Sequence, residues 1–346
     1  MTERWLFSAR TDIVVFAGSA LLSLLLLFWG TEHRLIDGES PEWVWVTGVL
    51  LVDVAHVWAT GFRVYFDVEE LKRRPYLYIS VPMLGYLLGI ALYSEGELVF
   101  WRVLAYVAVY HFVRQQYGWV ALYRARARER DRLGYWIDSA AVYAGSLYPL
   151  IYWHLQLPRN FAWFVQGDFM HGLPWWLERI ALGLYVFILA AYTCRSLWSW
   201  LAGRANPGKD LVVFTTAICW YAGIVVYNSD FAFTVTNVFI HGIPYIVLVY
   251  VYARRRAELR PNKFLSKLLM KGPWVVLLSI WALAYIEELF WDRTIWHERS
   301  WLFGSHWELA DGSKLMLVPL LALPQVCHYV LDGFIWKRKQ IPELFS

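Results

Sequence analysis

Charged residues are scarce in this sequence, and the motifs of many soluble enzymes are missing. Asp, Glu, Lys and Arg make up 17% of the 346 residues, whereas about a quarter of a soluble protein is charged. The three cysteines form no CxxC pair, which argues against a disulfide framework or a cysteine-ligated zinc site. Gly203–Lys209 matches the GxxxxGK of a phosphate-binding loop, but Asp210 stands where that loop requires Ser or Thr. The HxxxH and HxxHH boxes of membrane desaturases are also missing.

Long hydrophobic runs are the main feature of the sequence. Hydrophobic residues make up 59% of the chain, and apolar runs of about 20 residues, enough to span a bilayer, recur along it. We therefore predict an all-α, polytopic integral membrane bundle in which residues 1–346 form a single transmembrane domain of about ten helices. The expected spans are roughly 13–30, 44–66, 76–94, 98–123, 135–155, 175–200, 211–228, 231–252, 273–290 and 314–336.

The segments between these spans alternate in charge. Lys and Arg are concentrated in 67–75, 124–134, 201–210, 253–272 and the tail from Lys337, while the alternate segments are acidic or mixed. Because positively charged loops stay in the cytoplasm, we expect both termini there and a bacterial inner (plasma) membrane as the location. No small-residue cleavage site follows the first apolar run, so we expect an uncleaved first helix. Five arginines after the fourth span are expected to meet anionic lipid headgroups: Arg124, Arg126, Arg128, Arg130 and Arg132.

Four of the nine histidines fall inside predicted spans. His56, His111, His241 and His328 lie in the second, fourth, eighth and tenth spans, all of which run from outside to inside in this topology. Each lies about 10 to 14 residues from the outer end of its span, a depth of roughly 15–21 Å at 1.5 Å per residue. The sequence therefore predicts a histidine cluster at one depth of the membrane.

Polar neighbours accompany these histidines at helical spacing. Asp53 precedes His56 by three residues, and Asp332 follows His328 by four, so each pair shares a helix face. Ionisable groups in a membrane helix cost roughly 2.5–3.5 kcal/mol each, and they usually face the bundle interior and have a function. Pro244 and Pro324 interrupt two of the same spans. Further candidates for orienting the site are Gln115, Gln116, Asn237 and Gln325.

Imidazole and carboxylate together favour a transition metal. With no thiolate in position, we predict a non-haem iron centre. Its candidate ligands are Asp53, His56, His111, His241, His328 and Asp332, and the candidate catalytic residues beside it are Arg114 and Gln115. Six ligands exceed what one ion needs, so the centre is either dinuclear or keeps some of these groups as hydrogen-bond partners of the ligands.

The expected function is metal-dependent oxidation of a hydrophobic, lipid- or isoprenoid-like small molecule, by an oxygenase or desaturase. The expected partners are the lipid bilayer, this substrate and an electron-donor protein, with no nucleic acid. Three other functions compete: a proton-coupled transporter with the His and Asp residues as a relay, a b-type haem protein, and a lipid-modifying transferase in which Arg63 and Arg114 hold a phosphate. A Soret band identifies the haem protein, and pH-driven flux in liposomes identifies the transporter.

Overall fold

The computed structural model describes residues 4–259, 264–310 and 312–337. Over these residues the chain forms helices joined by turns and loops, without a β-strand. Seven helices are long and apolar enough to cross a membrane, or eight when the bent pair α15 (Lys314–Leu321) and α16 (Leu323–Ile335) counts as one span. The prediction of a helical membrane bundle is therefore confirmed, whereas the count of about ten spans is not reached.

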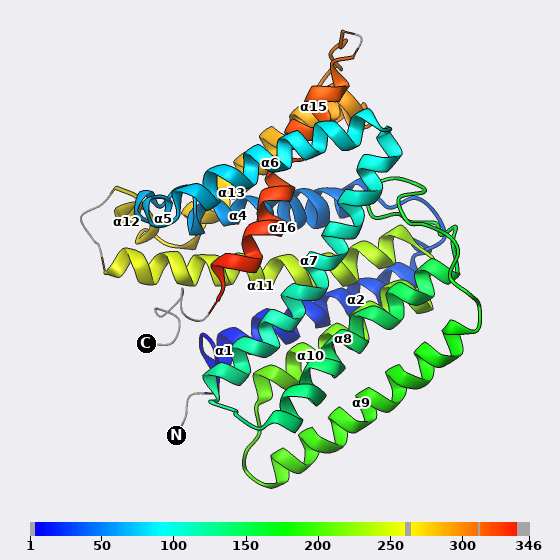
Figure 1. The fold of residues 1–346 in the computed structure, drawn as a ribbon, viewed down its shortest axis with the longest axis vertical. Helices are drawn as coiled ribbons and strands as arrows, with labels where there is room; N and C mark the ends of the chain where they lie inside the picture. The colour runs from blue at the N-terminus through cyan, green and yellow to red at the C-terminus, as the bar shows by residue number, and fades with distance from the viewer. Residues whose placement is uncertain (1–3, 260–263, 311, 338–346) are drawn as a thin grey trace. The chain divides into compact units, whose positions relative to one another are not determined.

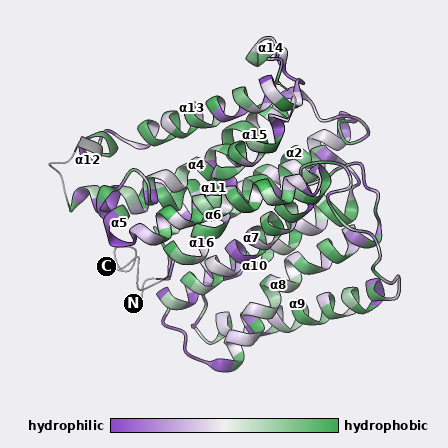
Figure 2. Cartoon of the chain, turned by 45° about the horizontal axis from the view of Figure 1, so that its top comes forward, coloured by the Kyte–Doolittle hydropathy of each residue, from purple (hydrophilic) through white to green (hydrophobic). Residues whose placement is uncertain are grey.

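The candidate spans combine α-helices with short π-helical segments, which carry the labels η1 to η4. The first span consists of α1 (Ala9–Asp12), η1 (Ile13–Ala17) and α2 (Gly18–Glu32). The second consists of α3 (Glu42–Val44), η2 (Trp45–Val54) and α4 (Ala55–Arg63), and the third is α6 (Pro75–Ser94). The others are α9 (Leu177–Leu201), α10 (Pro207–Trp220) with η3 (Tyr221–Val226), α11 (Asp230–Glu258), and α13 (Pro273–Trp291) with η4 (Asp292–Trp296). Short helices α5 (Val68–Arg73), α12 (Phe264–Leu269) and α14 (Ser300–Phe303) connect them. The hydrophilic colour of α5 contrasts with the largely hydrophobic long helices (Figure 2).

Two predicted spans account for most of the difference in number. The predicted spans 98–123 and 135–155 correspond to α7 (Glu97–Arg126) and α8 (Arg132–Leu155), of 30 and 24 residues. Both are long enough to cross a bilayer, but neither is among the helices apolar enough to be counted. In α7 the polarity comes partly from Arg102, His111 and Arg114. The predicted cytoplasmic ends of the chain lie outside the described residues.

The chain divides into two compact units. Among the described residues, unit 1 contains 4–48 and 109–244, and unit 2 contains 49–108 and 245–337 with its two gaps. In unit 1, α8 packs against α9 and α10, and these three helices run side by side in Figure 1. The contact between α8 and α10 is close because it uses small residues: a Cβ on Gly145 would lie 3.4 Å from the Cα of Ala217.

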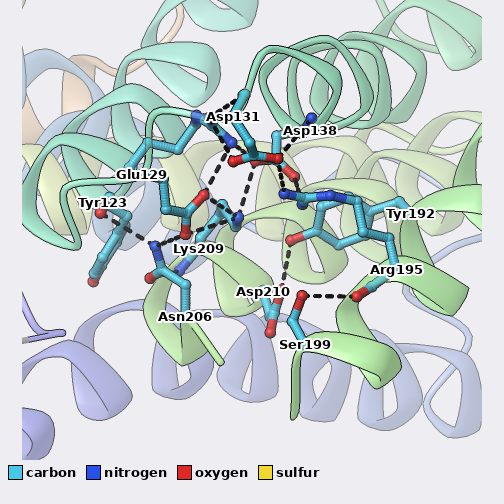
Figure 3. Close-up of polar contacts among 12 residues, drawn as sticks. Tyr123, Glu129, Asp131, Asp138, Tyr192, Arg195, Ser199, Asn206, Lys209 and Asp210 are labelled. Carbon is cyan, nitrogen blue, oxygen red and sulfur yellow. Dashed lines mark hydrogen bonds and ion pairs between the residues drawn. The ribbon is translucent and has the colours of Figure 1, made fainter. Parts of the chain in front are cut away.

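Buried ion pairs connect the ends of four helices in unit 1 (Figure 3). Lys209 on α10 donates to Glu129 Oε2 at 2.8 Å and to Asp138 Oδ2 on α8 at 2.9 Å. Arg195 on α9 donates to the other oxygen of Asp138 at 2.8 Å. Arg124, at the end of α7, donates to Glu129 at 2.9 Å and also to Asp138. Since Asp138 is fully buried and Lys209 is 4% exposed, this network fixes how the four helix ends meet.

This network changes the interpretation of two segments of the sequence. Arg124 was expected to meet lipid headgroups, but it is only 7% exposed and pairs with protein carboxylates. Asp210, which breaks the resemblance to a phosphate-binding loop, accepts hydrogen bonds from Tyr192 Oη at 2.6 Å and from Trp200 Nε1 at 2.9 Å. The segment around Lys209 therefore fastens α10 to its neighbours through side-chain pairing.

In unit 2, α16 packs against α4 and α6, and α13 packs against α4. Small residues again permit close contact, since a Cβ on Gly85 of α6 would lie 2.9 Å from the side chain of Val326 on α16. A Cβ on Gly89 would lie 2.8 Å from Pro319 on α15. The helices that carry two of the predicted site histidines, α4 and α16, are thus held directly together.

Unit 2 contains a second buried ionic cluster, centred on Arg63 and Glu70. Arg63 is fully buried, with its guanidinium 3.3 Å from Glu70 Oε1 and 3.0 Å from the carbonyl oxygen of Ile335. Tyr78 donates to Glu70 at 2.6 Å. Burial raises the pKa of Glu70, but the guanidinium of Arg63, the hydrogen bond from Tyr78 and the charge of Arg256 outweigh it, so its pKa lies below the ordinary value of 4.5.

Candidate metal centre

The predicted site histidines are buried and lie in two pairs, one in each unit. In unit 2, His56 lies on α4 and His328 on α16; in unit 1, His111 lies on α7 and His241 on α11; each is at most 3% exposed. Imidazoles are suitable metal ligands, so each pair is a candidate metal-binding group.

In unit 2, His56 and His328 form a perpendicular pair. Their ring centroids are 4.8 Å apart at an angle of 82°. The ring of Tyr245 meets both edge-on, at 5.8 Å from His56 and 4.9 Å from His328. Because these rings come from α4, α11 and α16, packing alone restricts how far either imidazole can rotate.

A chain of hydrogen bonds runs from His328 to a carboxylate. Thr60 Oγ1 lies 2.8 Å from His328 Nδ1 and 2.9 Å from Tyr245 Oη, and Tyr245 Oη donates to Asp332 Oδ1 at 2.7 Å. Asp332 also accepts from Trp336 Nε1 at 3.1 Å. An ionised carboxylate can only accept, so the chain is consistent when Tyr245 donates to Asp332, Thr60 donates to Tyr245, and His328 Nδ1–H donates to Thr60. This assignment leaves His328 Nε2 with its lone pair for a metal ion.

The two predicted carboxylate ligands lie beside the histidines of unit 2. Asp53 Oδ1 is 3.5 Å from His56 Nδ1, and Asp332 Oδ1 is 3.8 Å from His328 Nδ1. Asp332 reaches His328 through Tyr245 and Thr60, because the hydrogen bond of His328 Nδ1 is with Thr60 Oγ1. The geometry therefore suits an orienting role for Asp53 and Asp332 better than direct ligation.

In unit 1, His111 and His241 form a similar pair. Their ring centroids are 5.1 Å apart at 87°. The ring of Phe112 stacks on His241 at 3.5 Å and 7°, which fixes the plane of that imidazole. Gln115 Nε2 donates to the backbone oxygen of His241 at 2.8 Å, so this candidate catalytic residue supports the helix that carries a histidine, three residues before Pro244.

Arg114, the other candidate catalytic residue, takes a different direction from α7. It is exposed, donates to Tyr143 Oη on α8, and its guanidinium lies 4.6 Å from the ring centroid of Tyr117. These contacts hold it against aromatic rings of α7 and α8. Its role in catalysis stays a prediction. The contacts that the structure shows for Arg114 pack α7 against α8.

Three residues near the histidines were not among the predicted site residues. Thr60 and Tyr245 lie four residues after His56 and His241, and this helical spacing was the available signal. Glu287, on α13, accepts a hydrogen bond from Trp58 Nε1 at 2.6 Å and another from Gln325 Nε2. Glu287 is 5% exposed. The feature of the sequence that could have identified it is a carboxylate inside an apolar helix.

Imidazoles are suitable ligands for iron, zinc, copper or nickel. No protein-family model, curated protein or solved structure matches this chain.

Proposed function

We propose that this protein is a membrane-embedded, metal-dependent oxidoreductase that acts on a hydrophobic substrate at a non-haem iron ion. The observation that carries the proposal is the two pairs of buried histidines, His56 with His328 in unit 2 and His111 with His241 in unit 1, whose ring centroids are 4.8 Å and 5.1 Å apart. Imidazole binds iron well, and the candidate ligands include no thiolate, which a structural zinc or iron–sulfur site would favour. In a membrane protein, a lipid-soluble molecule approaches such a site from the bilayer.

Bound iron would supply activation of dioxygen. In the expected reaction one oxygen atom of O2 is inserted into a substrate C–H bond and the other leaves as water, with two electrons and two protons supplied from outside. An electron-donor protein is therefore the proposed partner, since the four histidines do not themselves supply electrons.

The chain's own residues would hold and orient the ion. His56, His111, His241 and His328 would bind it, since the sequence predicts one depth in the membrane for all four. Thr60 and Tyr245 would keep the proton of His328 on Nδ1, so that Nε2 faces the ion. Asp53 would hold His56 through its carboxylate, which lies 3.5 Å from Nδ1.

The surroundings also bear on the competing functions. A phosphate-binding transferase is disfavoured because Arg63 is buried against Glu70 and Arg114 is held by tyrosines. Proton transport remains the second candidate, because the chain from His328 through Thr60 and Tyr245 to Asp332 offers a hydrogen-bonded path for a proton.

The proposed topology has ten spans with both termini cytoplasmic in a bacterial inner membrane. It includes α7 and α8 as spans in addition to the apolar helices. The support is their length of 30 and 24 residues and the alternating charge of the loops. A polar α7 fits this topology because α7 carries His111, and ionisable groups in a membrane face the protein interior.

An absorption spectrum and a metal analysis on one detergent-purified sample test the proposal. We expect about one iron per chain and no Soret band, together with consumption of O2 when a reductant and a lipid extract are added. A Soret band would replace the proposal with a haem protein. Protein that holds neither metal nor haem, although never exposed to a chelator, would favour the proton path, and flux in liposomes would then be measured.

A further inference from the structure

A cavity in unit 2 reaches His328, one of the proposed metal ligands. It has a volume of about 290 Å³ and lies between α4, α15 and α16. Its wall includes His328 and Thr60, the imidazole and the hydroxyl that are hydrogen-bonded at 2.8 Å. All of its lining residues belong to unit 2, so the cavity is a feature of this unit alone.

The wall of the cavity is almost entirely apolar. Apart from His328, Thr60 and the hydroxyl of Tyr65 it is formed by aliphatic and aromatic groups and one thiol, that of Cys327. Two other lining residues, Phe66 and Leu320, are 39% and 49% exposed. In a membrane-spanning unit such exposed apolar side chains face lipid, so the cavity extends from a lipid-facing border to a histidine of the metal-binding group.

We propose that this cavity binds the hydrocarbon chain of the substrate and directs it from the bilayer to His328. The inference rests on the proposed function and names its substrate class: a molecule with a single flexible acyl or isoprenoid chain. The volume lies just below the ~300–1,000 Å³ of typical small-molecule pockets, which suits one chain better than a fused-ring lipid. An apolar wall cannot satisfy the hydrogen bonds of a polar substrate, which would enter at a desolvation cost.

Cys327 provides a reporter inside the cavity. It is 7% exposed and lines the cavity one residue before His328. The chain has two other cysteines, Cys194 and Cys219 on α9 and α10. A variant with Cys194→Ser and Cys219→Ser therefore carries one thiol, and the rate at which N-ethylmaleimide alkylates it in liposomes measures access to the cavity.

The experiment adds farnesol or palmitic acid to these liposomes before the maleimide. We expect saturating amounts of at least one of them to slow alkylation of Cys327 by about tenfold, because the bound chain covers the thiol. Protection by farnesol alone identifies an isoprenoid chain, and protection by palmitic acid alone identifies an acyl chain. Protection by neither, with cholesterol tested as the fused-ring alternative, would overturn the proposal.

Two tryptophan variants on α15 make the test specific. Leu320→Trp fills the lipid-facing border of the cavity and should abolish the protection by the added chain. Met316→Trp is the matched control, because Met316 lies one turn earlier, is 50% exposed and is not part of the cavity wall. Equal behaviour of the two variants would contradict the assigned position of the cavity.

Metal analysis separates this inference from the proposed function. Leu320→Trp should retain the iron of the parent protein while losing protection by the chain. If the parent protein holds no iron but farnesol or palmitic acid still protects Cys327, the proposed function fails and the binding cavity stands. If the parent protein holds iron and neither molecule protects, the oxidoreductase stands and the cavity fails.

Discussion

Replacing Thr60 by Val tests the hydrogen-bond chain that orients His328. The substitution keeps the shape of the side chain and removes one hydroxyl, which lies 2.8 Å from His328 Nδ1 and 2.9 Å from Tyr245 Oη. Thr60 is 3% exposed, so bulk water cannot easily replace the hydroxyl. Leaving a buried N–H without its acceptor costs about 1–3 kcal/mol, and losing a partner that orients a metal ligand typically weakens metal binding by about 10- to 100-fold.

The assay is competition between the protein and a chelator for iron(II) under anaerobic conditions. We expect the dissociation constant of Thr60→Val to rise by about 10- to 100-fold, which corresponds to about 1.4–2.7 kcal/mol. Thr215→Val is the matched control, because the hydroxyl of Thr215 donates to backbone carbonyls of its own helix, that of Leu211 at 2.7 Å. An unchanged dissociation constant in Thr60→Val, or an equal change in both variants, would refute the orientation assigned to His328.

Three further predictions concern the ionic and packing features of the two units. Lys209→Met should destabilise the protein by about 3–5 kcal/mol, measured by thermal unfolding in detergent, since it removes one of the three cations that pair with buried Asp138. Gly208→Ala should cost about 1–3 kcal/mol in the same assay, because its Cβ would lie 2.0 Å from the ring of Tyr123. Glu70 has a lowered pKa in the folded state, so its contribution to stability is present above pH 4.5 and is lost as the pH falls through the folded pKa. Glu70→Gln should therefore flatten the decline of the unfolding temperature at acid pH.

The predictions for Lys209 and Gly208 each have a control in the same chain. Arg130 is exposed, and Arg130→Met should change stability by no more than about 0.5 kcal/mol. Gly183 on α9 has no atom within 4 Å of its would-be Cβ, so Gly183→Ala should be neutral or slightly stabilising. An effect of Lys209→Met or Gly208→Ala as small as its control would contradict the packing described for unit 1. An acid decline unchanged by Glu70→Gln would contradict the role of the Arg63 and Glu70 pair.

Hydrophobic length and the charge of the loops were enough to predict a helical membrane protein. The number of spans was harder, because α7 and α8 combine sufficient length with polar side chains, so that length and hydropathy disagree about them. The contact between His56 and His328 was predictable for a specific reason. Depth along a span is proportional to residue number, so residues such as His56 and His328 at equal distances from the ends of co-directional helices lie at one level.

Which side chains contact the histidines depends on how each helix is rotated about its axis relative to its neighbours. Sequence spacing shows which residues share a face of one helix, but not which face of the next helix they meet. The positions of Thr60 and Tyr245, four residues after histidines, were compatible with a role in the site, but their contact with each other depends on how α4 and α11 pack. Arg114 lies three residues after His111, on the same face of α7. Which neighbour its long side chain reaches, here Tyr143 on α8, depends on how the two helices pack. Lys209 likewise gave no sign in the sequence that its partners would be Glu129 and Asp138.

The most direct test of the four-histidine centre is the iron content of single histidine variants. His111→Ala and His328→Ala each remove one proposed ligand, and they come from different units of the chain. His171→Ala, which alters an exposed histidine, is the control. With protein purified without chelators, we predict about one iron per chain in the parent and in His171→Ala, and less than about a tenth of that in the other two variants. Full iron content in both His111→Ala and His328→Ala would contradict the proposed centre.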